Sequence, residues 1–344
     1  MNWKVSERMK VCKRCIAHEG FPHVDIDSSG LCNYCREYPG RSRSRKEKAA
    51  YRKKFSKLAR DLKGKTDYDV LLCYSGGKDS TYTLFLLSRV YKLKVLAYTV
   101  DNGFVPSRTY ENIRNVCESL DVDHVLFKPR FGLLRKIFRA GLLKRCQYAS
   151  KTLERASTVC TYCTGIVKYS ALKLAVEKGI PMVAFGWSPG QAPTSSSIMR
   201  LNPAMIKSMQ SVLFGPMRKI VKSDMSAYML PESFFNSVND PPVLVHPLGF
   251  SDYNEKAILG RIQKFGWVKP KDTEMNATNC LLNPIADLAH MKKHGFHPYV
   301  LEIAALVREG YMPRREGLKH CPVKKDQKVI KFLSKRLGLK RGDI

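Results

Sequence analysis

Long apolar runs are missing from this sequence. The longest ones, such as Val70–Tyr74 and Leu84–Leu87, fall far short of the roughly 20 residues that a membrane-spanning helix requires. The first residues, Met1–Lys10, are polar and lack the apolar core of a secretory signal peptide. We therefore expect a cytoplasmic protein without a membrane span.

Acidic residues are scarce as well. The 344 residues include 30 Asp and Glu against 60 Lys and Arg, so the formal net charge is +30. Such a charge favours a polyanionic partner or an anionic substrate, although a generic basic surface would give the same count. Hydrophobic residues make up 44% and charged residues 26%, which excludes wholesale disorder and a fibrous repeat.

Cysteines, in contrast, are numerous. Their odd number, eleven, argues against a disulfide framework in a cytosolic chain and favours metal, cluster or catalytic thiols. Four of them form two Cys-x-x-Cys pairs, Cys12 with Cys15 and Cys32 with Cys35. Two such pairs can place four thiolates around one tetrahedral ion, and Zn²⁺ suits soft sulfur ligands. A ligand set that includes one of two nearby histidines, or four unrelated buried cysteines, are the alternatives.

The rest of the chain reads as helices and strands. Arg41–Lys65 holds twelve basic residues, and its apolar residues recur at helical spacing, which predicts a helix with a cationic outer face. From Tyr68 onward strands and helices alternate, which predicts an α/β fold with a doubly wound, mostly parallel sheet. The expected strands are 68–74, 94–100, 124–128 and 181–185. The expected helices are 80–91, 107–120, one that begins after Cys160 and runs to about residue 178, 253–266, 285–310 and a basic tail over 319–341. Residues 199–240 give no clear pattern.

The most informative segment is a glycine-rich loop between the first strand and the next helix, Ser75-Gly76-Gly77-Lys78-Asp79-Ser80. Its glycines let the backbone approach an anion, and the helix that follows presents unpaired N–H groups and a positive dipole end. Lys78 adds a cation, whereas Asp79 is suited to hold Mg²⁺ against phosphates. The loop is not a Walker A motif, which needs Ser or Thr directly after its lysine. The plain alternative is a glycine-rich turn without a ligand.

These six residues match, position by position, the SGGxDS loop of the PP-loop ATP pyrophosphatases (a HUP-like superfamily), which the sequence resembles. The resemblance implies that ATP is cleaved between its α- and β-phosphates and that AMP is attached to a substrate oxygen. It also implies nucleotide contacts from Asp101 and Asn102, after the second strand, and from Gly186, after the fourth. Asp-Asn-Gly is turn chemistry on its own, however, and Trp187 stands where many relatives have a histidine.

A second group of cysteines comprises Cys160 and Cys163, placed just before a predicted helix, and the distant Cys280. Three cysteines cannot close a tetrahedral zinc site alone. They match what a [4Fe–4S] cluster with one open iron needs, and that iron would be free to carry an exogenous sulfur. A redox or persulfide pair, a second zinc site completed by a histidine, and an inert pair stay open as alternatives.

This combination resembles the cluster-dependent tRNA thiouridine synthetases. Their pattern joins a zinc module, the PP-loop, a Cys-x-x-Cys at a helix start and a lone cysteine after a segment similar to His246–Glu255. The two ends of the chain, Cys12–Cys35 and Val307–Gly317, are also similar to N-acetyl sugar amidotransferases. Those enzymes use the same first step to convert an acetamido group into an acetamidino group with ammonia, in surface polysaccharide synthesis.

The favoured function is ATP-dependent activation of a carbonyl oxygen followed by sulfur transfer, with tRNA as the expected acceptor. The sugar amidotransferase is one alternative, and a non-enzymatic zinc-ribbon protein that binds nucleic acid is another. Expected catalytic residues are Lys78, Asp79, Cys160, Cys163 and Cys280, and expected cofactors are ATP, Mg²⁺, Zn²⁺ and a [4Fe–4S] cluster.

The same reading predicts partners and domains. Expected partners are tRNA or another polyanion, a protein that donates sulfur or ammonia, and a second copy of the chain in a homodimer. The basic segments 41–65, 130–145 and 319–341 are expected to line one face. The predicted domains are a zinc-binding module (8–38), a basic helical linker (39–66), a PP-loop ATP pyrophosphatase domain (67–260) and a helical basic C-terminal region (261–344).

Overall fold

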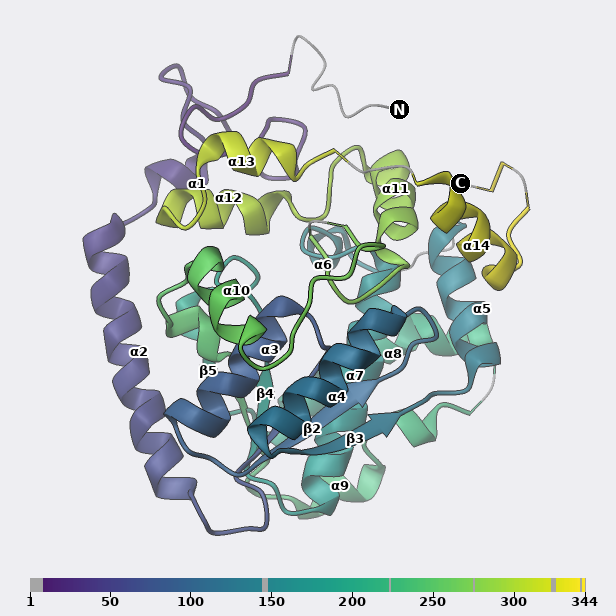
Figure 1. The fold of residues 1–344 in the computed structure, drawn as a ribbon. Coiled ribbons are helices and arrows are strands. Elements are labelled where there is room, and N and C mark those ends of the chain that lie inside the picture. The colour runs from purple at the N-terminus through teal and green to yellow at the C-terminus, as the bar shows by residue number, and fades with distance from the viewer. Residues whose placement is uncertain are drawn as a thin grey trace.

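A six-stranded sheet forms the centre of the fold, with the strand order β3-β2-β1-β4-β6-β5 (Figure 1). The computed structural model describes residues 9–143, 148–222, 224–274, 276–322, 326–340 and 342–343. The strands are β1 (Val70–Cys73), β2 (Val95–Val100), β3 (Asp123–Phe127), β4 (Met182–Phe185), β5 (Ile198–Met199) and β6 (Val243–Val245). Neighbouring strands pair in parallel, except that β5 runs antiparallel to β6 at one edge. The predicted α/β fold with a mostly parallel sheet is therefore confirmed.

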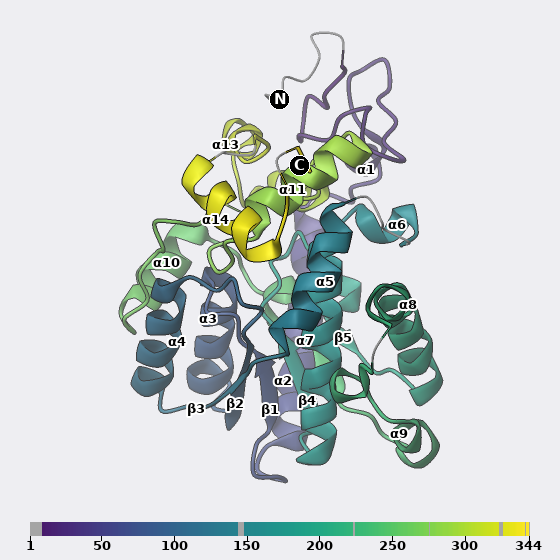
Figure 2. The same cartoon turned by 90° about the vertical axis from the view of Figure 1, so that its right-hand side faces the viewer.

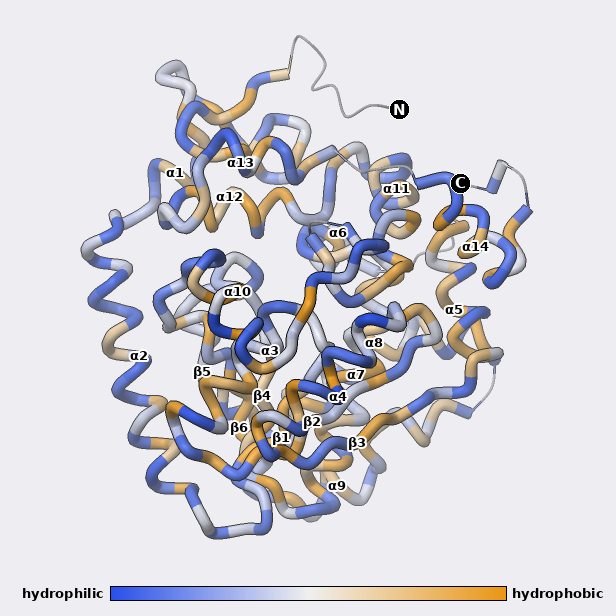
Figure 3. Tube along the Cα trace, in the orientation of Figure 1, coloured by the Kyte–Doolittle hydropathy of each residue, from blue (hydrophilic) through white to orange (hydrophobic). Residues whose placement is uncertain are grey.

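Helices cover both faces of this sheet (Figure 2). They are α1 (Asn33–Arg36), α2 (Arg41–Leu62), α3 (Lys78–Phe85, continued by a π-helical turn over Leu86–Val90), α4 (Ser107–Leu120), α5 (Phe131–Leu142), α6 (Ser150–Leu153), α7 (Thr158–Glu177), α8 (Pro203–Val221), α9 (Glu232–Ser237), α10 (Glu255–Gln263), α11 (Asn283–His294), α12 (Val300–Glu309), α13 (Arg314–Lys319) and α14 (Gln327–Leu337). Leu71 and Cys73 of β1 pack with α5, α7 and α8, whereas Val70 and Leu72 pack with α2, α3 and α4. Because both faces are covered, the central strands β1, β4 and β6 are apolar and buried throughout (Figure 3), whereas the edge strand β3 begins with Asp123 and His124 and is partly exposed.

The strand order reverses between β1 and β4. From β1 the chain moves through β2 to β3 on one side, while β4, β6 and β5 lie on the other. In an open parallel sheet the crevice for a ligand lies at the carboxyl ends of the strands where this reversal occurs. Here that crevice is bounded by the loops that follow β1 and β4.

The two ends of the chain are neighbours in space. The N-terminal cysteine-rich segment lies beside α12 and α13 (Figure 1), where Ile16 and Ala17 share an apolar cluster with Ile303 and Val307. The segments that resemble sugar amidotransferases therefore form one contact region. Among the described residues no helix is long and apolar enough to cross a membrane.

Several predictions of local structure are wrong. Residues 285–310 form two helices, because α11 ends at Gly295, whose φ of 79° leaves the right-handed helix, and α12 begins only at Val300. Cys160 and Cys163 lie inside the first turns of α7, which begins at Thr158, and not before it. The unassigned segment 199–240 contains α8 and α9.

The three basic segments do not line one face. Helix α2 lies on one side of the sheet, whereas α5 and α14 are neighbours on the far side (Figures 1 and 2). Gly338, at the end of α14, lies beside the guanidinium of Arg135 on α5. Residues 144–145, 323–325 and 341 of the predicted segments lie outside the described residues.

Candidate active site

The glycine-rich loop lies where the strand order reverses, between the end of β1 and the start of α3. Gly76 has a φ of 72°, and a Cβ there would approach side-chain atoms of Thr109 and Ile113 to 2.7 Å. The indole N–H of Trp267 donates a hydrogen bond to the Gly76 carbonyl at 3.0 Å. Glycine is thus required both by the left-handed backbone and by the close packing behind it.

The loop after β4 meets the start of α3. A Cβ on Gly186 would lie 2.3 Å from the Cα of Ser80, so only glycine allows this approach. The hydroxyls of Ser75 and Ser80 lie 3.0 Å apart, and the amide of Lys78 donates to Thr278 Oγ1 at 3.2 Å. The predicted loop and Gly186 therefore meet in one place.

A cavity of about 300 Å³ opens at this point. The predicted nucleotide-binding residues that line it are Ser75, Gly77, Lys78, Asp79, Ser80 and Gly186. Gly76 is buried behind the loop. The opposite wall comes from the C-terminal part of the chain and includes Thr278, Glu302 and Met312. The cavity also reaches Cys163, so one space joins the loop to the second cysteine group.

Lys78 and Asp79 are linked through Tyr253. Lys78 Nζ lies 3.2 Å from Asp79 Oδ1 and 3.6 Å from Glu255, and it also donates to the phenol of Tyr253. That phenol donates to Asp79 Oδ1 at 2.8 Å. Burial disfavours the charged amine, but Asp79 and Glu255 outweigh it, and the pKa of Lys78 is raised above its ordinary value. The lysine is therefore a full positive charge at the cavity wall.

Much of the cavity wall was not predicted from the sequence, including Thr278 and Glu302. Thr278 lies two positions before Cys280 and could have been found with it, whereas Glu302 carries no motif. Ser188 Oγ donates to Glu302 Oε1 at 2.6 Å. Burial raises the pKa of Glu302 to about 7, and the charge of Asp79 adds to this rise. The hydrogen bond from Ser188 lowers the pKa but does not outweigh burial.

Asp101 and Asn102 are outside the residues that line the cavity. Asp101 accepts from the Gly103 amide at 2.7 Å and lies 3.1 Å from Lys128 Nζ. Burial raises the pKa of Asp101, but the Gly103 amide and Lys128 lower it by more, so the pKa lies below its ordinary value. Asn102 points to the second cysteine group and not to the loop.

Two of the three cysteines of that group, Cys163 and Cys280, meet at Asn102. Its side-chain Nδ2 lies 3.6 Å from the sulfur of Cys163 and 3.6 Å from that of Cys280. The third thiol, Cys160, lies 3.7 Å from Asn283 Oδ1. Burial raises the pKa of each of the three thiols, that of Cys163 to about 12. Such thiols stay protonated unless a metal replaces the proton.

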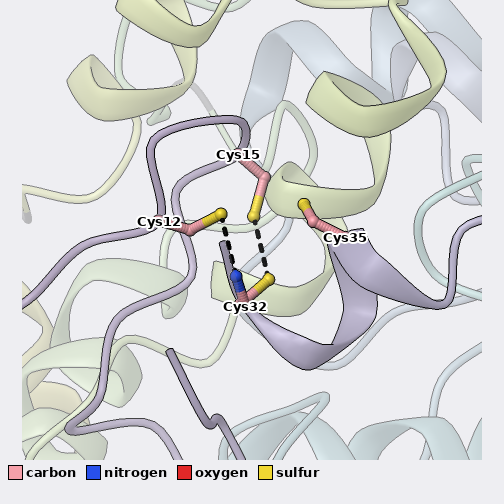
Figure 4. Close-up of side chains that lie close together, drawn as sticks. All are labelled: Cys12, Cys15, Cys32 and Cys35. Carbon is pink, nitrogen blue, oxygen red and sulfur yellow. Dashed lines mark hydrogen bonds between the residues drawn. The ribbon is translucent and has the colours of Figure 1, made fainter. Parts of the chain in front are cut away.

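The N-terminal cysteines form a tighter group (Figure 4). The sulfurs of Cys12, Cys15, Cys32 and Cys35 all lie within 4.8 Å of one another, and no other group of three or more His, Cys, Asp or Glu residues in the described part of the chain meets this limit. Backbone amides donate to two of the sulfurs, Ala17 to Cys15 at 3.4 Å and Cys32 to Cys12 at 3.3 Å.

These four thiols could hold one tetrahedral ion. Hydrogen bonds from Cys32 and Cys35 hold the pKa of Cys15 far below its ordinary value, while the pKa values of Cys32 and Cys35 themselves are raised. The wider group around Asn102 suits a larger cluster better than a single ion.

Comparisons with known proteins give distant likenesses. No family model matches the chain. An uncharacterized protein of Methanocaldococcus jannaschii is 24% identical over 273 residues, which span 79% of this chain and 79% of that protein.

Three solved structures are also similar. The U34-tRNA thiolase NcsA from Methanococcus maripaludis, with its [4Fe-4S] cluster, is 16% identical with a TM-score of 0.36, over 96% of this chain and 99% of that one. A predicted subunit of tRNA methyltransferase from Methanocaldococcus jannaschii is 16% identical with a TM-score of 0.32, over 74% and 95%. The NH3-dependent NAD synthetase from Campylobacter jejuni is 13% identical with a TM-score of 0.31, over 66% and 99%.

Proposed function

We propose that the protein is an ATP pyrophosphatase of the PP-loop type that activates a carbonyl oxygen by adenylation. The observation that carries this proposal is the loop Ser75–Ser80 at the point where the strand order reverses, with Lys78 and Asp79 facing a cavity that extends to Cys163. The substrate oxygen attacks the α-phosphorus of ATP, the bond between the α- and β-phosphates breaks, and pyrophosphate leaves.

Different residues of the loop would have different roles in this step. The backbone N–H groups at the start of α3 and the charged amine of Lys78 bind the phosphates and neutralise the charge that develops on pyrophosphate. Asp79 would hold Mg²⁺, which would supply a Lewis acid on the phosphate oxygens. Gly186 keeps the opposite loop close to Ser80 and so shapes the pocket.

The second step replaces AMP on the activated carbon, and we assign it to sulfur transfer on tRNA. Cys163 lines the cavity, Asn102 joins it to Cys280, and Cys160 lies three residues before Cys163 on α7. Three cysteines are the ligands that a [4Fe–4S] cluster with one open iron needs. Bound there, the cluster would supply an open iron for an exogenous sulfur. The net charge of +30 suits a phosphodiester backbone, which the neighbouring basic helices α5 and α14 would contact.

Nitrogen transfer to an acetamido sugar is the second candidate, because the chain ends that resemble sugar amidotransferases pack together. Arg314 donates to the carbonyls of Cys12 and Cys15 at 3.0–3.2 Å and 2.8 Å, respectively. Helix α12, which precedes Arg314 in the chain, supplies Glu302 and Leu306 to the cavity wall. We assign Zn²⁺ to the four N-terminal cysteines in either case.

The first step is tested by the products of ATP. The protein is incubated with MgATP and bulk tRNA, and AMP and pyrophosphate are expected. Lys78→Ala should slow pyrophosphate release by about 10²–10³-fold, since a preorganised charge is lost. Lys57→Ala, the same change on the exposed face of α2, should leave the rate unchanged. Release of ADP and orthophosphate, or an unaffected Lys78→Ala variant, would overturn the proposal.

The second step is tested by anaerobic purification with iron and sulfide analysis. A brown protein that loses its iron in Cys163→Ser and yields thiolated tRNA supports sulfur transfer. A colourless protein that contains zinc alone and converts a nucleotide-linked acetamido sugar with ammonia would replace the first candidate by the second. Cleavage of ATP into AMP is expected for both sulfur transfer and nitrogen transfer, so the two tests are independent.

A further inference from the structure

Asn102 occupies a rigid turn after β2. Its Oδ1 accepts a hydrogen bond from the Phe104 amide at 2.9 Å, and Gly103 between them has a φ of 82°. An amide oxygen engaged in this way fixes the orientation of the group, so the two N–H donors must point in the opposite direction. In that direction lie the sulfurs of Cys163 and Cys280, each 3.6 Å from Nδ2.

The same turn is tied to the segment that carries Cys280. The Leu281 amide donates to the Phe104 carbonyl at 2.9 Å. On the other side, Asp101 accepts from the Gly103 amide and pairs with Lys128. A single buried side chain, 8% exposed, thus bridges a helix start at Cys163 and a loop at Cys280 that lie more than a hundred residues apart in the sequence.

We propose that Asn102 is a positioning residue of the three-cysteine site, and that its N–H groups donate to the sulfurs of Cys163 and Cys280 when these ligate a cluster. This inference rests on the cluster of the proposed function. Hydrogen bonds to ligating sulfurs stabilise the more negative, reduced state of an iron–sulfur cluster and therefore raise its reduction potential. They also orient the ligands, and loss of such outer contacts typically lowers metal affinity about 10- to 100-fold.

Asn102→Asp removes the side-chain N–H donors of Asn102. The aspartate keeps an oxygen for the Phe104 amide but turns an oxygen, in place of N–H, toward the two sulfurs. Asn102→Leu removes both functions without adding charge and serves as the second variant should Asn102→Asp fail to fold. Asn202→Asp is the matched control, because Asn202 is exposed and its Oδ1 caps α8 through the Met205 amide, a role that aspartate also fills.

The experiment uses the full chain, reconstituted anaerobically with iron and sulfide. Folding is checked by thermal unfolding, and the iron content and the midpoint potential of the cluster are measured. We expect Asn102→Asp and Asn102→Leu to shift the potential to more negative values and to weaken iron retention against a chelator about 10-fold or more. Asn202→Asp should match the wild type in both.

The outcomes separate the inference from the function on which it rests. A wild-type chain that takes up no cluster contradicts sulfur transfer through these cysteines and, with it, the inference. A wild-type cluster whose potential and retention are unchanged in both Asn102 variants overturns the inference alone. A raised KM for ATP without any change in potential would instead assign Asn102 to the nucleotide.

Discussion

Tyr253 donates its phenolic proton to Oδ1 of Asp79 at 2.8 Å, although the two residues are 174 positions apart in the sequence. Burial raises the pKa of Tyr253 well above its ordinary value, and the carboxylate of Asp79 adds to this, so the phenol keeps its proton. The same phenol accepts from Lys78. The lysine and the carboxylate of the loop are therefore held in place before any nucleotide arrives.

Tyr253→Phe removes this support and leaves the ring. Hydrogen bonds to charged groups contribute about 1.5–3 kcal/mol, so the KM for MgATP should rise about 10-fold or more, measured by pyrophosphate release. Tyr82→Phe is the control, because Tyr82 lies on α3, the helix that begins with Lys78 and Asp79, and its ring stacks on Phe85. Equal KM values for the two variants would show that Asp79 needs no partner before the metal binds.

Gly186→Ala tests the close approach of the two loops. The new Cβ would lie 2.3 Å from the Cα of Ser80. Because this is a backbone atom, the clash can be relieved only if the start of α3 moves. We expect a loss of about 3 kcal/mol in the free energy of unfolding, measured with urea, together with weaker ATP binding. Gly132→Ala is the control, since Gly132 lies in α5 with open space around it, and alanine is the better helix former. A stable Gly186→Ala variant with normal ATP affinity would contradict this packing.

The central fold could be predicted because its strands are covered on both faces and are therefore short apolar runs separated by helical patterns. The edge strand β5 could not, since it has two residues and depends on its pairing with β6. The helix α8 had a signal that was not used: Asn202 followed by Pro203 marks a helix start.

The site was predictable only in part, for a related reason. The loop Ser75–Ser80 combines its residues within one segment, so the motif and its geometry are local. Asn102 marks the end of a strand, but the sequence does not show that its side chain turns toward Cys163 and Cys280. Glu302 reaches the cavity through tertiary packing of α12, which no local pattern reveals.

Glu302 predicts a pH dependence of stability. Burial raises its pKa from 4.5 to about 7, so the folded protein holds a proton that the unfolded chain has already released. The contribution of Glu302 to stability is therefore full below pH 4.5 and is lost as the pH rises toward about 7, by at most about 3 kcal/mol.

Glu302→Gln cannot release this proton. Urea unfolding at pH 5 and pH 8 should show the wild type losing stability relative to the variant as the pH rises. The opposite sign, or parallel curves, would mean that Glu302 is ionised in the folded protein across this range.

The contact of Arg314 with the N-terminal cysteine loop should stabilise that loop. Its guanidinium donates to the carbonyls of Cys12 and Cys15, so Arg314→Ala should lower the free energy of unfolding by about 2–3 kcal/mol. Arg315→Ala, the same change at an exposed neighbour, should have little effect. Because the contact needs an ordered cysteine loop, a chelator that removes the metal should abolish the difference between Arg314→Ala and wild type. A difference that survives metal removal would show that the cysteine loop is ordered without an ion, and the four sulfurs would then have a structural role that needs no metal.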